Sequence, residues 1–420
     1  MGASFEPMTR GEWWKYDDKR LKALLDTIKD KKPVSGVDTK DIIIPDNDFN
    51  NSSINDFINA GQDANDKKTF TLKTSSGEIL SKVNWKSECN DFNHQHNLNK
   101  VRDFNTKSTI SKVSEDENNT YSVFPYPIEN PHFGEQSKVS LPHNEEASPF
   151  GWHDVDGIIG AEYTVTRGNN VNAYEDGDNR GHQPDGGTEL VFDFPFNPSY
   201  SSSDQSEDAA ITNLFYWNNI IHDILYHYGF DEESGNFQVK NYTGNGIEND
   251  EVLAEAQDNL SSCNAFFSSP PDGINGVMQM FICSDRDGSF DNHVVIHEYI
   301  HGLSNRLTGG PSNADCLRNA EQMGEGWSDW FGLMITMEEG DESTDPRGIG
   351  NFASGRAADG NGIRNAPYST DLSINNFTYN DSNNEAAVSQ PHGVGFVFAT
   401  MLWDLTWAYI DKYGFDPDLF

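Results

Sequence analysis

Apolar residues recur along this chain at two different spacings. In residues 208–228 they return at every third or fourth position, as Leu214, Trp217, Ile221 and Ile224 do, and Gly229 follows. A period near 3.6 places such side chains on one face of a helix, and glycine is common just beyond a helix end. We therefore predict a helix over residues 208–228 with a buried face.

The surrounding chain divides into three regions by the same criterion. Residues 119–290 carry aromatic and β-branched clusters between turn signals, and residues 188–196 (TELVFDFPF) are typical of strands. From residue 291 the helical period returns in residues 294–307, 323–339 and 391–414. Residues 1–118 mix Lys, Asp, Asn and Ser with few apolar runs. We predict an α+β protein with an auxiliary segment over 1–118, a β-rich lobe over 119–290 and a helical lobe over 291–420.

The charge balance excludes two classes of partner. The 420 residues contain 29 Lys and Arg against 67 Asp and Glu, so the net charge is 29 − 67 = −38. Nucleic acid and anionic membrane surfaces would repel such a chain. The most apolar stretch, residues 393–410, has about the minimum length of a membrane span, roughly 18 residues. Because it contains Asp404, we interpret it as a buried helix.

Three weaker signals concern cysteine, export and calcium. The four cysteines are too few for a disulfide scaffold, although they allow one or two bridges, and their lack of CxxC spacing excludes a zinc knuckle. The first residues lack the apolar core of a signal peptide, so either export information is missing or the protein stays inside the cell. Acidic loops such as residues 242–251 (YTGNGIENDE) could bind Ca²⁺, and solvated surface is the competing interpretation.

The sequence HEYIH carries the most informative chemistry. On a helix, His297 and His301 lie one turn apart on the same face, so both imidazoles can reach one metal ion, with Glu298 beside it. The apolar run before the motif would bury one side of this helix. The alternative interpretation is two core histidines that have hydrogen-bond partners and bind no metal. The residues downstream argue against it.

A second segment, GEGWSD, supplies the remaining ligand types. Glu325 would complete a set of two nitrogens and one carboxylate, which leaves a fourth zinc position open for water, as catalytic sites require. Asp329 follows four residues later on the same helix face and can accept the free ring N–H of a ligand histidine. An ordinary surface carboxylate is the alternative for Glu325, and the conjunction with HEYIH makes it unconvincing.

These residue types suit hydrolysis of a peptide bond. Zinc lowers the pKa of bound water and polarises a carbonyl, while Glu298 can take a proton from the water and return it to the leaving amine. A developing oxyanion needs a donor opposite the metal, and His392, at the start of the apolar helix, is the best candidate. The alternative for His392 is a simple helix-terminus histidine. Arg364 could contact a substrate carbonyl or form an ordinary salt bridge.

Longer stretches around these residues resemble the fungalysin family of secreted zinc metallopeptidases, relatives of thermolysin. The segments HEYIHGLSNRLTGGP, CL and MGEGWSDW, at residues 297–311, 316–317 and 323–330, look like the active-site block of that family. YSVFPYPIENP, ASPFGWHDVDG, TRGNNVNAYED, NLFYWNNIIHDILYHYGF and PPDGINGVMQMF extend the similarity over roughly residues 120–420.

The resemblance implies a thermolysin-like fold of two lobes with the HEYIH helix between them. His297, His301 and Glu325 would be the zinc ligands, Glu298 the general base, Asp329 the partner of a ligand histidine and His392 the oxyanion donor. Asn264 and Ala265 resemble the edge strand that pairs with substrate backbone, which implies broad endopeptidase action on proteins or peptides. We also expect secretion and a monomer.

Family members are made as precursors whose pro-region blocks the site, and residues 1–118 stand in its place, although they are short and match it poorly. The chain ends at Phe420, where the family pattern continues, so we expect a truncated helical lobe. Cys263 and Cys283 depart from the pattern and could form a bridge beside the substrate strand or stay free thiols. His293 also departs, and we interpret it as a surface histidine rather than an extra metal contact.

Two other hypotheses remain beside the zinc endopeptidase. A truncated, catalytically silent homologue could serve as a zinc-binding or regulatory module, which the missing lobe favours and the intact Glu298 does not. A structural zinc protein would need a fourth protein ligand, and only His293 offers one.

Overall fold

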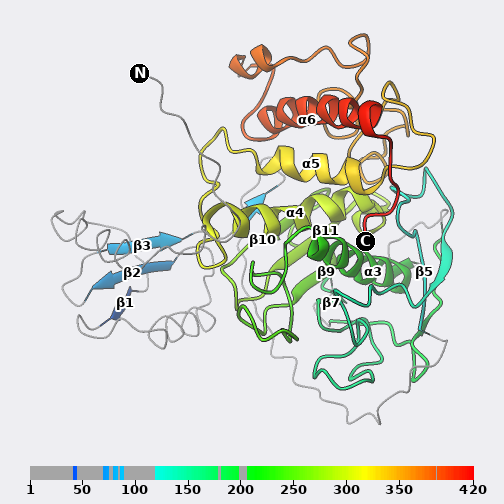
Figure 1. The fold of residues 1–420 in the computed structure, drawn as a ribbon, viewed down its shortest axis with the longest axis vertical. Coiled ribbons are helices and arrows are strands. Elements are labelled where there is room, and N and C mark those ends of the chain that lie inside the picture. The colour runs from blue at the N-terminus through cyan, green and yellow to red at the C-terminus, as the bar shows by residue number, and fades with distance from the viewer. Residues whose placement is uncertain are drawn as a thin grey trace. The chain divides into compact units, whose positions relative to one another are not determined.

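The computed structural model describes residues 119–177, 181–197, 206–384 and 386–420, together with the backbone of four short strands nearer the N-terminus (Figure 1). The chain forms two compact units, Met1–Asn84 and Trp85–Phe420. In the first unit, β1 (Asp41–Ile44), β2 (Phe70–Thr74) and β3 (Ile79–Val83) form a sheet of that order, parallel between β1 and β2 and antiparallel between β2 and β3. The remainder of the predicted segment 1–118 lies mostly outside the described residues.

The second unit is built on a mixed sheet in the order β4-β10-β11-β9-β7. Its strands are β4 (Lys86–Glu88), β7 (Val171–Glu175), β9 (Val252–Asp258), β10 (Ala265–Ser268) and β11 (Val277–Cys283), and β12 (Arg286–Asp287) pairs with β11. Strands β7, β9 and β11 run parallel, whereas β10 is antiparallel to both of its neighbours. Every residue of β7 is buried, as expected for a strand covered on both faces.

A smaller sheet has the order β6-β5-β8, formed by β5 (Thr120–Val123), β6 (Ser137–Ser140) and β8 (Val191–Phe192). The strand prediction for residues 188–196 is therefore largely wrong, because only two of those residues enter a ladder. Pro195 has no backbone N–H to donate, and the chain beyond Phe192 instead packs the partly buried Phe194 and Phe196 on the core.

The helix α3 (Glu207–His227) confirms the prediction for residues 208–228 within one residue at each end. It contacts β5, β7 and β9 on one side and α4 (Asn292–Gly309) on another, so it is enclosed rather than half exposed. All residues from 209 to 225 are buried. This helix therefore lies in the core of the unit.

The rest of the second unit is mainly helical, which confirms the α+β class. The helices α4, α5 (Gly324–Ile335) and α6 (His392–Tyr413) lie one above another, α5 in contact with both of its neighbours (Figure 1). Short 3-10 helices, η2 (Gly288–Phe290) and η3 (Tyr379–Asn383), precede α4 and α6. The boundary predicted at residues 290 and 291 coincides with the start of α4, and the division into lobes stays a prediction.

The apolar stretch at residues 393–410 forms most of α6. Among the described residues, this is the one helix whose length and composition would allow it to cross a membrane, and 56% of its most apolar window is buried inside the protein. Trp403 and Trp407 face a core shared with α5, whereas Leu405 and Tyr409 are exposed. The inner face of α6 is therefore buried, as the sequence analysis predicts.

Candidate active site

The helix α4 brings the two histidines of HEYIH together as the four-residue spacing predicts. The Nε2 atoms of His297 and His301 lie 3.1 Å apart, and both side chains are buried. Glu298 follows His297 on the same helix and is fully buried. The cause is local, because one α-helical turn places residues i and i+4 about 5–6 Å apart at Cβ.

Glu325 reaches the same point from α5. Its Oε2 lies 3.3 Å from His297 Nε2, and its Oε1 lies 3.6 Å from His301 Nε2. Donor atoms at about 2.0–2.1 Å from a tetrahedral ion are about 3.3–3.4 Å from one another, so the two nitrogens and the Glu325 carboxylate lie close to the spacing of three tetrahedral ligands. The group could offer three ligand atoms to one metal ion, which would leave one tetrahedral position for another molecule.

The protonation of His297 also fits a cation at this point. Its Nδ1 lies 2.8 Å from Asp329 Oδ1, and the carboxylate only accepts, so Nδ1 donates and the Nε2 of a neutral ring carries a lone pair. Burial lowers the pKa of His301 to about 3, which keeps that ring neutral at pH 7. Two neutral imidazoles and one carboxylate are the forms that bind a metal ion.

Asp329 is the centre of a buried hydrogen-bond network. It accepts from His297, from Arg364 Nε at 2.6 Å and from the Tyr368 hydroxyl at 2.5 Å. Burial alone would raise the pKa of this carboxyl, but Arg364 and His297 together hold the pKa of Asp329 well below its usual range. The network keeps Asp329 ionised and therefore keeps the proton of His297 on Nδ1.

Arg364 forms an ion pair with Asp329, and its guanidinium also lies 3.3 Å from Glu325 Oε2. This is the salt-bridge role that the sequence left open, yet Arg364 also lines the adjoining cavity. Burial would raise the pKa of Glu325, but the histidines around it lower that pKa overall. Tyr368 is a site residue that the sequence analysis missed, because nothing in PYST marks it as a partner of Asp329.

Two glycines allow α6 to approach α5 at Glu325. A Cβ on Gly395 would lie 2.5 Å from Glu325 Cβ, and a Cβ on Gly326 would lie 2.6 Å from the Gly395 carbonyl oxygen. Only glycine fits at such a close crossing. As a result His392, the first residue of α6, lies with its Nε2 3.6 Å from Glu325 Oε1.

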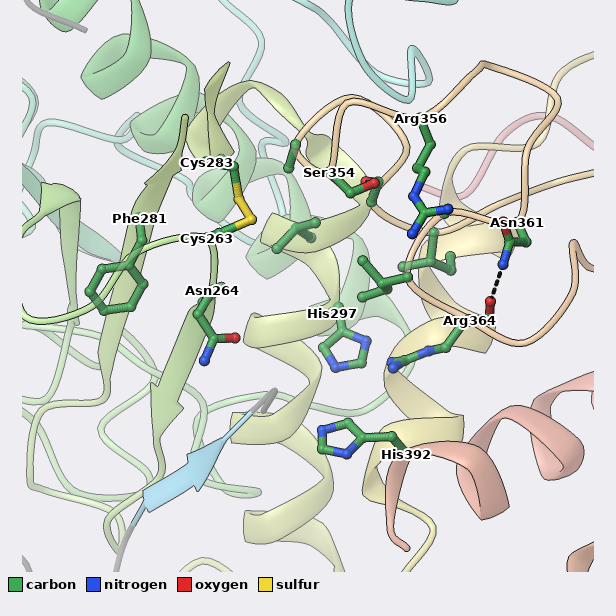
Figure 2. Close-up of a pocket in the computed structure, with 18 residues that line it drawn as sticks. Cys263, Asn264, Phe281, Cys283, His297, Ser354, Arg356, Asn361, Arg364 and His392 are labelled. Carbon is green, nitrogen blue, oxygen red and sulfur yellow. Dashed lines mark hydrogen bonds between the residues drawn. A yellow bond between two sulfur atoms is a disulfide. The ribbon is translucent and has the colours of Figure 1, made fainter. Parts of the chain in front are cut away.

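A cavity of about 250 Å³ opens beside this cluster (Figure 2). The lining includes His297, His392 and Arg364 together with Asn264 and Ala265. Figure 2 shows the side chains of His392, from α6, and Arg364, from the loop after α5, extending toward His297, with Asn264 on the other side of His297. The aliphatic part of the lining comes from residues on α4 and from two loops after α5, namely Val294, Ile349 and Ile363.

The predicted substrate strand is only partly an edge. Ala265 pairs with Met280 of β11, but Phe266, Phe267 and Ser268 of β10 pair with β4 on their other side. In the described ladder, the pairing with β4 covers Phe266 to Ser268, and Asn264 and Ala265 lie in the lining of the adjoining cavity.

A Cys263–Cys283 disulfide joins the start of this segment to the end of β11 (Figure 2). Of the two possibilities for these cysteines, the structure has the bridge. Both cysteines line the cavity, and Phe281 N donates to the Asn264 carbonyl between them. The bridge holds Asn264 in place where the strand pairing ends.

His293 differs from its prediction, because it is fully buried and not on the surface. Its ring contacts Thr336 Oγ1 at 2.7 Å and the Gly348 carbonyl oxygen at 3.2 Å, and it is not part of the metal-binding group. The sequence could not show this, because the atoms that cover His293 come from α5 and the loop after it.

Calcium remains a prediction. Other groups of carboxylates or histidine close enough to share an ion are His182–Glu207–Asp208, Asp154–Asp156–Glu162 and Asp176–Glu255–Asp258. Among the described residues none of these groups includes a residue of the 242–251 loop. That loop contacts one of them, since the Tyr242 hydroxyl donates to Asp154.

The family model and the most similar known proteins agree on one family. The family model for fungalysin metallopeptidases matches residues 120–420. Extracellular metalloproteinase 10 of Coccidioides posadasii is 42% identical over 312 residues, which is 70% of this chain and 47% of that protein. Extracellular metalloproteinase 2 of Trichophyton tonsurans is 40% identical over 312 residues, 71% of this chain and 48% of that protein.

Extracellular metalloproteinase mep of Aspergillus fumigatus is 42% identical over 311 residues, which is 70% of this chain and 46% of that protein. The chain thus spans about half the length of the curated relatives it matches. The matched part contains the whole of the cluster described above.

Proposed function

Because this chain belongs to the fungalysin metallopeptidase family, we propose that it is a zinc-dependent endopeptidase that hydrolyses peptide bonds in proteins. The observation that carries the proposal is the convergence of His297 Nε2, His301 Nε2 and the Glu325 carboxylate at tetrahedral spacing. His297, His301 and Glu325 would hold the ion. When bound, zinc lowers the pKa of a coordinated water toward 7 and polarises a carbonyl group.

The remaining residues have roles that follow from their chemistry. Glu298, next to the ligand His297, takes the proton of the attacking water and returns it to the leaving amine. Asp329 holds His297 in the tautomer that leaves Nε2 unprotonated. His392 and Arg364, which both line the cavity, donate to the oxygen on which negative charge develops.

Substrate recognition follows from the cavity and the strand beside it. The backbone of an extended peptide pairs with Asn264 and Ala265, which favours no particular sequence. The side chain after the cleaved bond enters the space lined by Val294, Ile349 and Ile363, so aliphatic or aromatic side chains are preferred there. The relatives are named extracellular proteins, and we propose that this protein too is secreted and acts as a monomer.

The test follows zinc content and cleavage of an unfolded protein substrate together. Glu298→Gln should bind one zinc ion per chain and lose activity by about 10²–10⁴-fold, because general-base catalysis contributes that much. The matched control is Glu233→Gln, an exposed glutamate that should keep both properties.

Activity that survives in Glu298→Gln would refute the role of Glu298. Zinc binding without hydrolysis by the unaltered chain would favour the silent homologue instead. We also expect a folded His301→Ala variant to lose zinc binding, whereas the control variant retains it.

A further inference from the structure

Arg356, in the lining of the cavity, and Arg286, against the loop beside it, differ from the other arginines whose side chains the structure describes. The others whose side chains are described each form an ion pair with a carboxylate: Arg167, Arg306, Arg318, Arg347 and Arg364. Arg286 and Arg356 pair with no carboxylate in the part of the chain that the structure describes. In a chain of net charge −38, two unpaired guanidinium groups are unexpected.

Arg286 contacts the loop that carries Arg356. Arg356 lines the cavity and is exposed, and Figure 2 shows its side chain extending from its loop toward the space beside Asn361 and Arg364. A Cβ on the neighbouring Gly355 would lie 3.3 Å from Arg286 Nε, so Arg286 packs on the backbone next to Arg356. The Arg286 guanidinium also lies over the Phe352 ring, 5.4 Å from its centroid, which restricts its orientation.

The ligand that this arrangement suits is a carboxylate. Guanidinium groups bind carboxylates through paired, charge-assisted hydrogen bonds, and neither Arg286 nor Arg356 has such a partner among the described residues. The lining of the cavity also contains the aliphatic residues Val294, Ile349 and Ile363, and Val294 and Ile363 meet beside Gly350. A charged side chain among these aliphatic groups would lose its hydration, so the carboxylate belongs on a neighbouring residue of the substrate.

We propose that Arg356 and Arg286 form a carboxylate-binding subsite, so that the protein prefers substrates with a negative charge shortly after the residue that fills the cavity. The charge can be an Asp or Glu side chain or the C-terminal carboxylate of a short peptide, because both present the same group. This inference rests on the proposed peptidase function. At physiological ionic strength the Debye length is about 8 Å, so the local guanidinium groups outweigh the distant negative charge of the chain.

The first test compares peptides that differ only in charge. An internally quenched peptide carries leucine after the cleaved bond, and each of the next three positions is scanned with Glu or Gln. A shortened peptide carries either a free C-terminus or an amide. With the full chain at physiological ionic strength, we expect kcat/KM to be about three- to tenfold higher for the better-placed carboxylate than for its neutral counterpart. Glu in place of the leucine should give no such gain.

Variants then assign the preference to the two arginines. In Arg356→Gln and Arg286→Gln the charged-to-neutral ratio should fall, and in the double variant it should approach one. Arg356→Lys should retain part of the preference, because it keeps the charge but loses the paired geometry. The matched control is Lys412→Gln, an exposed cation on α6, which should leave the ratio as it is. An equal rate for both peptides, or a ratio unchanged in the double variant, would overturn the proposal.

Binding separates this inference from the proposed function. Fluorescence anisotropy of the same peptides with the Glu298→Gln variant measures recognition without cleavage. Tighter binding of the charged peptide, abolished by the double arginine change, would support the subsite even in a chain that does not hydrolyse peptides. Equal binding of both peptides would refute the subsite whether or not hydrolysis occurs.

Discussion

At the scale of single residues, the carboxylate of Asp329 connects His297 to the rest of the site. Its partners come from α4 and from the segment after residue 360, so one side chain joins three parts of the chain. Burying it would be costly without these partners, because an unpaired charge in the interior loses its hydration. The network therefore serves both folding and ligand orientation.

Changing Asp329→Asn should weaken zinc binding by about 10–100-fold, because the amide is uncharged and no longer secures the N–H of His297. Competition with a chromogenic chelator measures the affinity without using activity. Asp359→Asn, at an exposed position, is the control and should bind zinc like the unaltered chain. An unchanged zinc affinity in Asp329→Asn would show that His297 is oriented by other contacts.

At the scale of elements, the site depends on how closely α6 crosses α5. The glycines at 326 and 395 allow contact between helix backbones where Glu325 leaves α5. Any side chain at this crossing would separate the helices and move His392 away from Glu325.

Gly395→Ala should lower kcat/KM by at least about tenfold and destabilise the fold by about 1–3 kcal/mol, because overpacking forces the helices apart. The control is Gly332→Ala on α5, where the nearest atom lies 3.7 Å from the added Cβ. That change should be neutral or stabilising, since alanine favours helix. Steady-state kinetics and chemical denaturation measure both effects, and a fully active Gly395→Ala variant would contradict the close-crossing argument.

The pairing of β4 with β10 suggests a second test at this scale. The strand β4 occupies the side of Phe266–Ser268 along which an extended substrate would continue. Ser87→Pro should break this pairing, because proline lacks the backbone N–H and fits poorly in a ladder. We expect kcat/KM for protein substrates to rise about three- to tenfold, as a few backbone hydrogen bonds no longer compete. Ser87→Ala keeps the backbone donor and should leave the rate unchanged, and equal rates for both variants would count against competition at β10.

At the scale of the whole molecule, a buried carboxyl at the start of α4 links stability to pH. Asp291 is fully buried, and its Oδ2 accepts from Ala353 N at 2.9 Å. Burial raises the pKa of Asp291 from 3.8 to about 7 in the folded protein. Because the pKa is higher in the folded protein, the protonated carboxyl contributes to the free energy of unfolding. This contribution is complete below pH 3.8 and is lost as the pH rises through about 7.

Asp291→Asn removes this titration while keeping an acceptor for Ala353. The parent should therefore lose stability relative to the variant as the pH rises. The free energy of unfolding of the variant minus that of the parent should be about 1–3 kcal/mol larger at pH 8 than at pH 4. Urea unfolding in a Glu298→Gln background measures it without self-digestion. Asp359→Asn should show no such change with pH, and a difference that is flat for Asp291→Asn as well would refute a raised pKa.

Much of the site could be predicted from local spacing. The four-residue steps from His297 to His301 and from Glu325 to Asp329 indicate shared helix faces, and both pairs point inward together in the structure. The helix at residues 208–228 was predictable for the same reason. The structure of residues 188–196 was not predictable in this way, because only two of them form a strand. Aromatic and β-branched composition does not distinguish a ladder from a packed loop.

The sequence by itself therefore determined the helices, the residue types of the metal-binding cluster and the family. These features depend on backbone hydrogen bonds between near neighbours, which have a fixed period. Only the tertiary structure decided which distant residues complete them. Several features depend on how separate elements pack. They are the contacts of Tyr368 with Asp329 and of Gly395 with Glu325, the burial of His293, the Cys263–Cys283 bridge and the two unpaired arginines. Packing joins side chains by shape and charge across the fold, and no spacing along the chain records it.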